Sequence, residues 1–170
     1  MLLVCAVLSL PFLIPVSIPG VSTAFGLAIV LFSVGITINR VPWLPQRILD
    51  RQLPAEALRQ TFQKAERVVK RVEGIVQPRL LVVSATPVAR ALHGAGLVLG
   101  GLLLMVPFGF VPFSNTLPAV AILLLALGML ERDGWLIIGG HLMNAATLVY
   151  FSTLAAGAWA AGRGLAGLVG

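Results

Sequence analysis

The chain has 170 residues, of which 58% are apolar and 11% are charged, and its mean hydropathy is +1.00. A soluble domain of this size cannot bury so much apolar surface, because the surface of a folded chain shrinks too slowly relative to its mass. The composition therefore predicts an integral membrane protein and excludes intrinsic disorder and a conventional soluble enzyme. The formal net charge is +6, and ten of the 12 Lys and Arg residues lie between Arg40 and Arg90.

Five apolar segments follow one another along the chain and are expected to be helices. They span residues 1–14, 22–38, 88–106, 117–130 and 135–161. A helix that crosses about 30 Å of hydrocarbon needs about 20 residues, so the first and the fourth segments are too short for a full crossing. We predict one all-α membrane domain over residues 1–170. Its parts are a first broken hairpin, a basic amphipathic segment, a second broken hairpin and a last transmembrane helix, at residues 1–39, 40–87, 88–131 and 134–162.

Proline-rich breaks join the first segment to the second and the third to the fourth. Both breaks, at residues 11–20 and 107–118, contain Pro-Phe, then Pro, then Ser, then Pro in the same order, which indicates an internal repeat. In lipid, the backbone groups freed by proline must be buried in protein or line a wet cavity. Paired interrupted segments are also typical of transport sites. The candidate ligand or pathway residues in the breaks are Pro19, Gly20, Ser114, Asn115 and Pro118. Alternatively, both breaks are plain turns at the membrane surface, and Asn115 caps the helix that follows it.

The basic middle of the chain is expected to contain an amphipathic helix. Between Pro54 and Pro78 apolar residues recur at alternating steps of four and three, and the two prolines suit its start and its end. The positive-inside rule assigns this region to the cytoplasmic side. Basic residues off the apolar stripe are expected to bind anionic lipid headgroups; they are Arg59, Lys64, Arg67, Lys70 and Arg71. The alternative is a helix packed over the cytoplasmic mouth of the protein or against a second copy. Nothing resembles a recognition helix, so nucleic acid is not expected as a partner.

A charged turn, Glu131-Arg132-Asp133, ends the fourth segment. If each pair of segments is a hairpin, this turn lies on the same side of the membrane as the basic middle, and the fifth segment crosses once. An ion-paired turn at the headgroup level explains these residues without a function. At the mouth of a cavity, Arg132 would instead attract an anionic group such as phosphate, so Arg132 and Asp133 are candidate site residues.

Two further pairs fall on single helix faces. His141 and Asn144 lie three residues apart in the fifth segment, so they share a face and could bind a proton or a polar headgroup. Alternatively, they form hydrogen bonds across a helix interface. Gly96 and Gly100 form a Gly-xxx-Gly pattern, which lets two helices approach closely. The sequence leaves open whether that packing is within the chain or between chains, as in a homodimer.

The residues for catalysis and metal binding are missing from the sequence. The single cysteine, Cys5, cannot form an internal disulfide, and no Cys and His cluster has the spacing of metal ligands. No acid and base pair can be placed around a glycosidic bond. We therefore expect no catalytic residues, no metal and no cofactor.

Several short motifs resemble the bacterial exopolysaccharide-synthesis ExoD family. They are Ile18-Pro19-Gly20, Val41-Pro42-Trp43-Leu44-Pro45, Gln77-Pro78-Arg79-Leu80, Pro112-Phe113-Ser114-Asn115-Thr116-Leu117-Pro118-Ala119 and Leu130-Glu131-Arg132-Asp133-Gly134. The resemblance covers most of the chain. It implies a bacterial inner-membrane protein connected with exopolysaccharide production, and it implies no known reaction or catalytic residue set.

Three functions are compatible with these observations. The first is a small transporter, channel or lipid-handling protein with a site at the two breaks. The second is a non-catalytic accessory or scaffold subunit that contacts polysaccharide-assembly proteins. The third, an enzyme acting on a lipid-linked sugar, is the least favoured, and we expect the protein not to be an enzyme.

Overall fold

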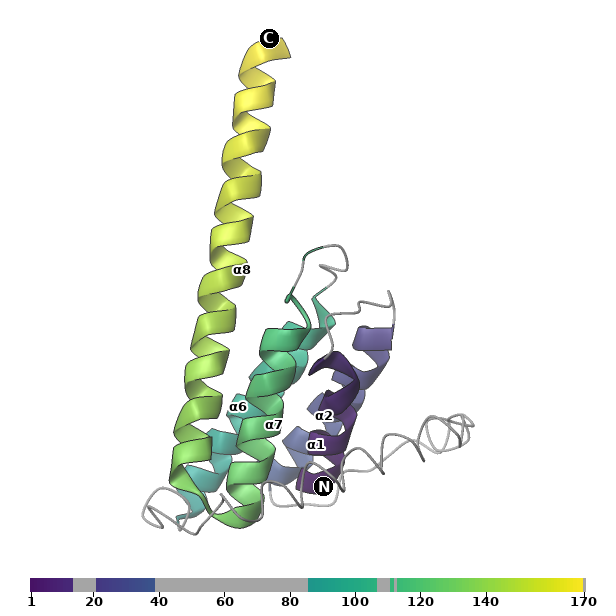
Figure 1. The fold of residues 1–170 in the computed structure, drawn as a ribbon, viewed down its shortest axis with the longest axis vertical. Helices are drawn as coiled ribbons and strands as arrows, with labels where there is room; N and C mark the ends of the chain where they lie inside the picture. The colour runs from purple at the N-terminus through teal and green to yellow at the C-terminus, as the bar shows by residue number, and fades with distance from the viewer. Residues whose placement is uncertain (14–20, 39–85, 107–110, 112, 170) are drawn as a thin grey trace.

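The computed structural model describes residues 1–13, 21–38, 86–106, 111 and 113–169, and every regular element among them is helical (Figure 1). The elements are α1 (Leu2–Ser9), the 3-10 helix η1 (Leu10–Leu13), α2 (Val21–Ile38), α6 (Pro87–Met105), α7 (Thr116–Glu131) and α8 (Gly134–Val169). Each of the five apolar segments predicted from the sequence is therefore helical. The predicted basic helix lies outside the described residues.

Four of the helices form a bundle, and α8 runs along one side of it (Figure 1). Helix α2 packs mainly against α6, and α7 packs against α8, α1 and α6. The last residues of η1 and α6 and the first residues of α2 and α7 lie at one end of the bundle, which we call the break end. The turn between α7 and α8 lies at the opposite end, together with the N-terminus, the end of α2 and the start of α6. We call this the charged-turn end.

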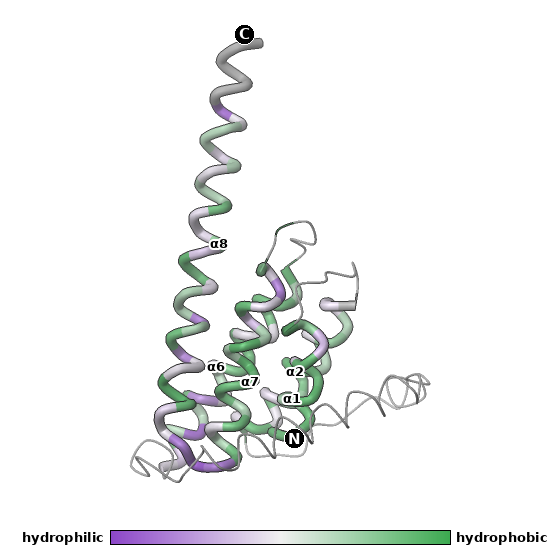
Figure 2. The backbone as a smooth tube through the Cα atoms, viewed as in Figure 1, coloured by the Kyte–Doolittle hydropathy of each residue, from purple (hydrophilic) through white to green (hydrophobic). Residues whose placement is uncertain are grey.

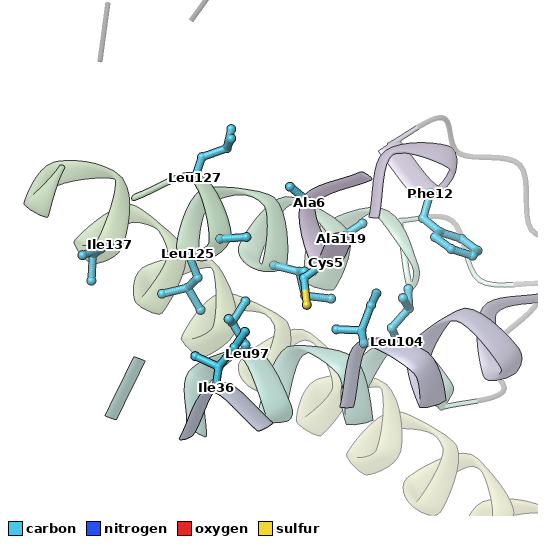
Figure 3. Close-up of a cluster of buried hydrophobic side chains, with 13 residues drawn as sticks. Cys5, Ala6, Phe12, Ile36, Leu97, Leu104, Ala119, Leu125, Leu127 and Ile137 are labelled. Atoms are coloured by element: carbon cyan, nitrogen blue, oxygen red, sulfur yellow. The ribbon is translucent and has the colours of Figure 1, made fainter. Parts of the chain in front are cut away.

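A continuous apolar core joins the bundle helices (Figure 3). Its buried members come from all five helices and from η1: Cys5, Ala6, Phe12, Ile29, Ile36, Leu97, Leu104, Ala119, Ile122, Leu125, Ala126, Leu127 and Ile137. The rings of Phe12 and Phe25 meet edge to face with centroids 5.5 Å apart, which fixes η1 against α2. Two buried hydroxyl groups are satisfied within their own helices, since Ser33 donates to the carbonyl of Ile29 and Thr147 to that of Met143, both at 2.7 Å.

Helices α2 and α6 approach each other through glycine. A Cβ on Gly26 would lie 2.9 Å from the carbonyl oxygen of Gly101, and a Cβ on Gly101 would lie 2.8 Å from Cγ2 of Val30. Both distances are too short for a side chain, so the two backbones meet only because these positions have none.

Two of the helices in the described part of the chain are long and apolar enough to cross a membrane. They are α6, with 19 residues, and the part of α8 from Gly134 to Arg163, with 30 residues. Leu2–Leu13, Ser22–Ile38 and Thr116–Glu131 are shorter apolar helices. Figure 2 shows that hydrophilic residues gather where α7 ends and α8 begins, while the bundle above them is mostly hydrophobic.

Helix α8 continues past the predicted last transmembrane helix. The predicted segment ends at residue 162, whereas the helix continues to Val169. An arginine such as Arg163 does not end a helix, and no proline follows Pro118 in the chain. Among the side chains described up to Arg163, Phe151 is the last buried one of α8. From Ser152 to Arg163 nearly every residue is exposed, and this outer half of α8 extends beyond the bundle (Figure 1).

Candidate functional site

The strongest concentration of polar side chains inside the bundle lies between α6 and α8. Nδ1 of His93 and Nε2 of His141 are 2.9 Å apart, within hydrogen-bonding distance, and the ring centroids are 5.2 Å apart. Asn144, one turn after His141, donates from Nδ2 to the carbonyl oxygen of Gly96 at 2.9 Å. We call His93, His141 and Asn144 the His–Asn cluster. It joins the two helices that are long enough to cross a membrane.

The polar side chains of the His–Asn cluster are largely buried, and removing them from water costs free energy. His93 is 4% exposed and Asn144 is 3% exposed, while His141 is partly exposed. Oδ1 of Asn144 is buried and has no hydrogen-bond partner in the described part of the chain. A buried polar atom without a partner loses its hydration and gains nothing in return. Such an atom in a native fold therefore requires an explanation beyond packing.

The glycine pattern of α6 creates the space for this cluster. A Cβ on Gly96 would lie 2.7 Å from Cε1 of His141, and a Cβ on Gly100 would lie 2.8 Å from Cγ1 of Ile122 and 3.4 Å from Oδ1 of Asn144. Gly96 and Gly100 thus pack against α8 and α7 of the same chain. The sequence had left open whether this close approach was within the chain or between chains, and these contacts are internal.

The residues of the second break lie elsewhere. Ser114 is buried and donates from Oγ to the carbonyl oxygen of Val111 at 2.9 Å. Asn115 is at the N-cap position of α7 and is 7% exposed, but its side chain makes no capping hydrogen bond. Pro118 is buried in the first turn of α7, where the missing N–H has no helical partner to lose. Asn115 lies about 24 Å along α7 from the charged turn, by the rise of an α-helix.

The charged turn has a structural explanation. Arg132 adopts a left-handed conformation with φ of 56°, and its backbone N–H and that of Asp133 both donate to the carbonyl oxygen of Gly128. Asp133 is 5% exposed, and its Oδ1 accepts a hydrogen bond from the backbone N–H of Trp135 at 2.9 Å. Asp133 therefore caps α8, and the exposed Arg132 ends α7.

The candidates named from the sequence thus fall in three separate places. Ser114, Asn115 and Pro118 are at the break end, Arg132 and Asp133 are at the charged-turn end, and only His141 and Asn144 come together with Gly96 and Gly100. The remaining candidates lie outside the described residues: Pro19, Gly20, Arg59, Lys64, Arg67, Lys70 and Arg71.

His93 is the residue that the sequence analysis missed. A signal was present, since His93 lies three residues before Gly96 and seven before Gly100, on the same face of α6. The chain contains only two histidines, and both lie on helix faces that make the α6–α8 contact.

The cluster has the chemistry of hydrogen bonding and proton binding. A neutral imidazole has one donor and one acceptor nitrogen, and a protonated imidazole has two donors. The described residues contain no group of three or more His, Cys, Asp and Glu side chains that could hold a metal ion.

The fold and this site define a class: an all-helical protein, over the part the structure describes, with polar side chains between two helices of membrane-spanning length. Residues 1–153 match the family described as exopolysaccharide synthesis, ExoD, and the chain belongs to that family. Protein ExoD of Rhizobium meliloti is 52% identical over 164 residues, which cover 96% of this chain and 68% of that protein. An uncharacterized protein of Synechocystis sp. is 28% identical over 159 residues, covering 88% of this chain and 74% of that protein. No solved structure matches the chain.

Proposed function

We propose that this protein is a multi-pass protein of the bacterial inner membrane that moves an ion, a small solute or a lipid-linked carrier during exopolysaccharide synthesis. Membership of the ExoD family supports the link to exopolysaccharide synthesis. The observation that carries the transport role is the buried His–Asn cluster between α6 and α8. Ionisable and amide side chains are costly inside a membrane, and they are typical of transport pathways.

The helix arrangement supports a topology with two hairpins. Ile38 at the end of α2 and Pro87 at the start of α6 flank the basic middle of the chain, and both lie at the charged-turn end (Figure 1). The basic region therefore begins and ends on the same side as Glu131, Arg132 and Asp133, and the positive-inside rule makes that side cytoplasmic.

The pairing of the helices supports the internal repeat. If the two breaks are equivalent, α1 corresponds to α6 and α2 to α7. The contact between α1 and α7 then corresponds to the contact between α6 and α2, and both are extensive. Such a pattern is expected of two similar halves related by an approximate two-fold axis along the bundle.

The site of the proposed activity is the His–Asn cluster rather than the two breaks. At the break end, Ser114 bonds to a nearby carbonyl and Pro118 begins a helix, so both have local roles. The His–Asn cluster, by contrast, contains a buried acceptor that packing alone leaves unpaired. No catalytic step is part of this proposal, and anionic lipid headgroups are its proposed contacts at the cytoplasmic surface.

The test uses an exopolysaccharide-producing bacterium that lacks its own ExoD-family gene and carries variants of this chain. We expect Asn144→Leu and His141→Gln to lower exopolysaccharide at least tenfold while the protein remains in the membrane at normal amounts. The matched control is Thr147→Val, one turn further along α8 at a buried position whose hydroxyl bonds only within its own helix. Normal polysaccharide in the Asn144→Leu and His141→Gln strains would refute the role of the cluster.

A scaffold role is the second candidate, and the outer half of α8 favours it. This segment is exposed between Ser152 and Arg163 apart from one partly buried position, Leu154, and it lies almost wholly beyond the residues matched by the family. A subunit that recruits a polysaccharide-assembly protein, or a second copy of itself, would use such a surface. Deletion of residues 154–170 then abolishes exopolysaccharide, whereas variants of the His–Asn cluster have little effect.

A further inference from the structure

We infer that the His–Asn cluster is a proton-binding site in which His93 and His141 together hold one added proton. The ligand is the proton itself, which turns one ring into an imidazolium that donates to the other ring across the contact between Nδ1 of His93 and Nε2 of His141. This inference rests on the proposed function in one respect, because it names the proton as the ion of the proposed transport. The binding of the proton is a property of the His–Asn cluster itself and does not depend on transport.

The proton count follows from the hydrogen bond between the rings. In the neutral pair, one ring nitrogen donates and the other accepts, with the two atoms 2.9 Å apart. One added proton leaves an acceptor at the shared contact and makes the hydrogen bond charge-assisted, which strengthens it. A second proton would bring two N–H groups and two positive charges face to face, which breaks the bond. The pair can therefore hold one added proton across an intact hydrogen bond, and a second only with separation of the rings.

Asn144 provides the partner for the added charge. Its Nδ2 is committed to the carbonyl oxygen of Gly96, which leaves the negative end of the amide dipole, Oδ1, without a hydrogen bond. Asn144 lies one turn beyond His141 on the same face of α8, and it is 3% exposed. In a site of low dielectric, an oriented dipole of this kind acts strongly on a nearby charge. The amide thus favours the protonated pair without the cost of a buried carboxylate.

The charged and titratable groups on the surrounding elements are few. On α6 itself, Arg90 stands one turn before His93. Helix α7 carries charge only at its end, at Glu131 and Arg132, and the α7–α8 turn adds Asp133, which is occupied as the cap of α8. Helix α2 carries no charged residue and α1 carries Cys5, while Tyr150 and Arg163 stand further along α8. These are the charged and titratable groups of the described helices, and the Asn144 amide contributes its dipole to the site.

The chain contains only two histidines, so one selective label reports on the whole site. The protein is labelled with 15N-histidine, purified through a tag without histidine, placed in lipid nanodiscs and followed by NMR from pH 4 to pH 9. We expect both rings to shift together at a single midpoint with the uptake of one proton. A coupling through the hydrogen bond should join Nδ1 of His93 to Nε2 of His141.

Two variants distinguish the effect of the Asn144 amide on the titration midpoint from the effect of packing. In Asn144→Leu, which keeps the volume but removes the dipole, the midpoint should fall by at least half a pH unit. In Thr147→Val, the matched polar-to-apolar change one turn further along α8, the midpoint should stay where it is in the parent protein. Equal shifts in the two variants would overturn the role assigned to Asn144.

Two results would overturn proton sharing. The first is independent titration, in which each histidine takes up its own proton. The second is the absence of any histidine titration across the whole pH range. The exopolysaccharide test is separate: if the rings share a proton but His141→Gln still supports full production, proton binding stands and the transport proposal fails. If production is lost but the rings titrate independently, the site stands and the two rings do not share one added proton.

Discussion

Asn144 on α8 donates a hydrogen bond to the backbone carbonyl of Gly96 on α6 at 2.9 Å. The carbonyl of Gly96 is accessible to this side chain because position 96 has no side chain of its own, and the same absence makes room for His141. Gly96 on α6 and the polar side chains of α8 therefore form one contact. The glycine makes room for the side chains, and Asn144 bonds to the glycine carbonyl.

Gly96→Ala should destabilise the protein by about 1–3 kcal/mol, because the new Cβ meets the His141 ring at 2.7 Å and the helices must separate. Unfolding of the detergent-solubilised protein measures this loss. Gly157→Ala is the control, since a Cβ there meets nothing within 4 Å and alanine is the better helix former. Equal effects of the two substitutions would contradict a close α6–α8 contact.

Arg132→Gly should stabilise the α7–α8 turn by about 0.5–1 kcal/mol. Arg132 has a φ of 56°, a conformation that glycine adopts without strain, and its side chain is exposed. The midpoint of thermal unfolding should rise. A fall in the midpoint would show instead that the arginine side chain has a stabilising partner.

Asp133→Ala should cost about 1 kcal/mol, because the backbone N–H of Trp135 loses the carboxylate that accepts its hydrogen bond. Asp133→Ser should recover most of the loss, since a serine hydroxyl can cap the helix without a charge. If Asp133→Ser is as unstable as Asp133→Ala, the carboxylate has a role other than capping.

The two ends of the bundle should react with thiol reagents from opposite sides of the membrane. In a Cys5→Ala background, single cysteines replace Phe113, exposed at the break end, and Arg132, exposed at the charged-turn end. Impermeant reagents added to whole cells should label Phe113→Cys, while Arg132→Cys should react only after the cells are opened. Labelling of both from the outside would refute the topology with two hairpins.

The sequence predicted the helices well because their signals are local. Apolar runs and prolines mark the segments, so α2, α6 and α7 begin and end within a residue or two of the predicted bounds. The predicted last transmembrane helix, residues 134–162, lies within α8, which continues to Val169. The site was predicted only in part: His141 and Asn144 share one helix, so spacing found them, but their partners His93 and Gly96 belong to α6, and no local pattern reports a contact across 48 residues.

A small tilt of helix α8 produces a larger movement of its far end. The helix runs without interruption from the charged turn to Val169, and it is held on the bundle only as far as Phe151. Its far end lies about 42 Å from His141, so a tilt of about 5° at the His–Asn cluster moves that end by about 4 Å. A displacement of the two imidazole rings that is too small to disturb the core would therefore produce a larger displacement at the far end of α8.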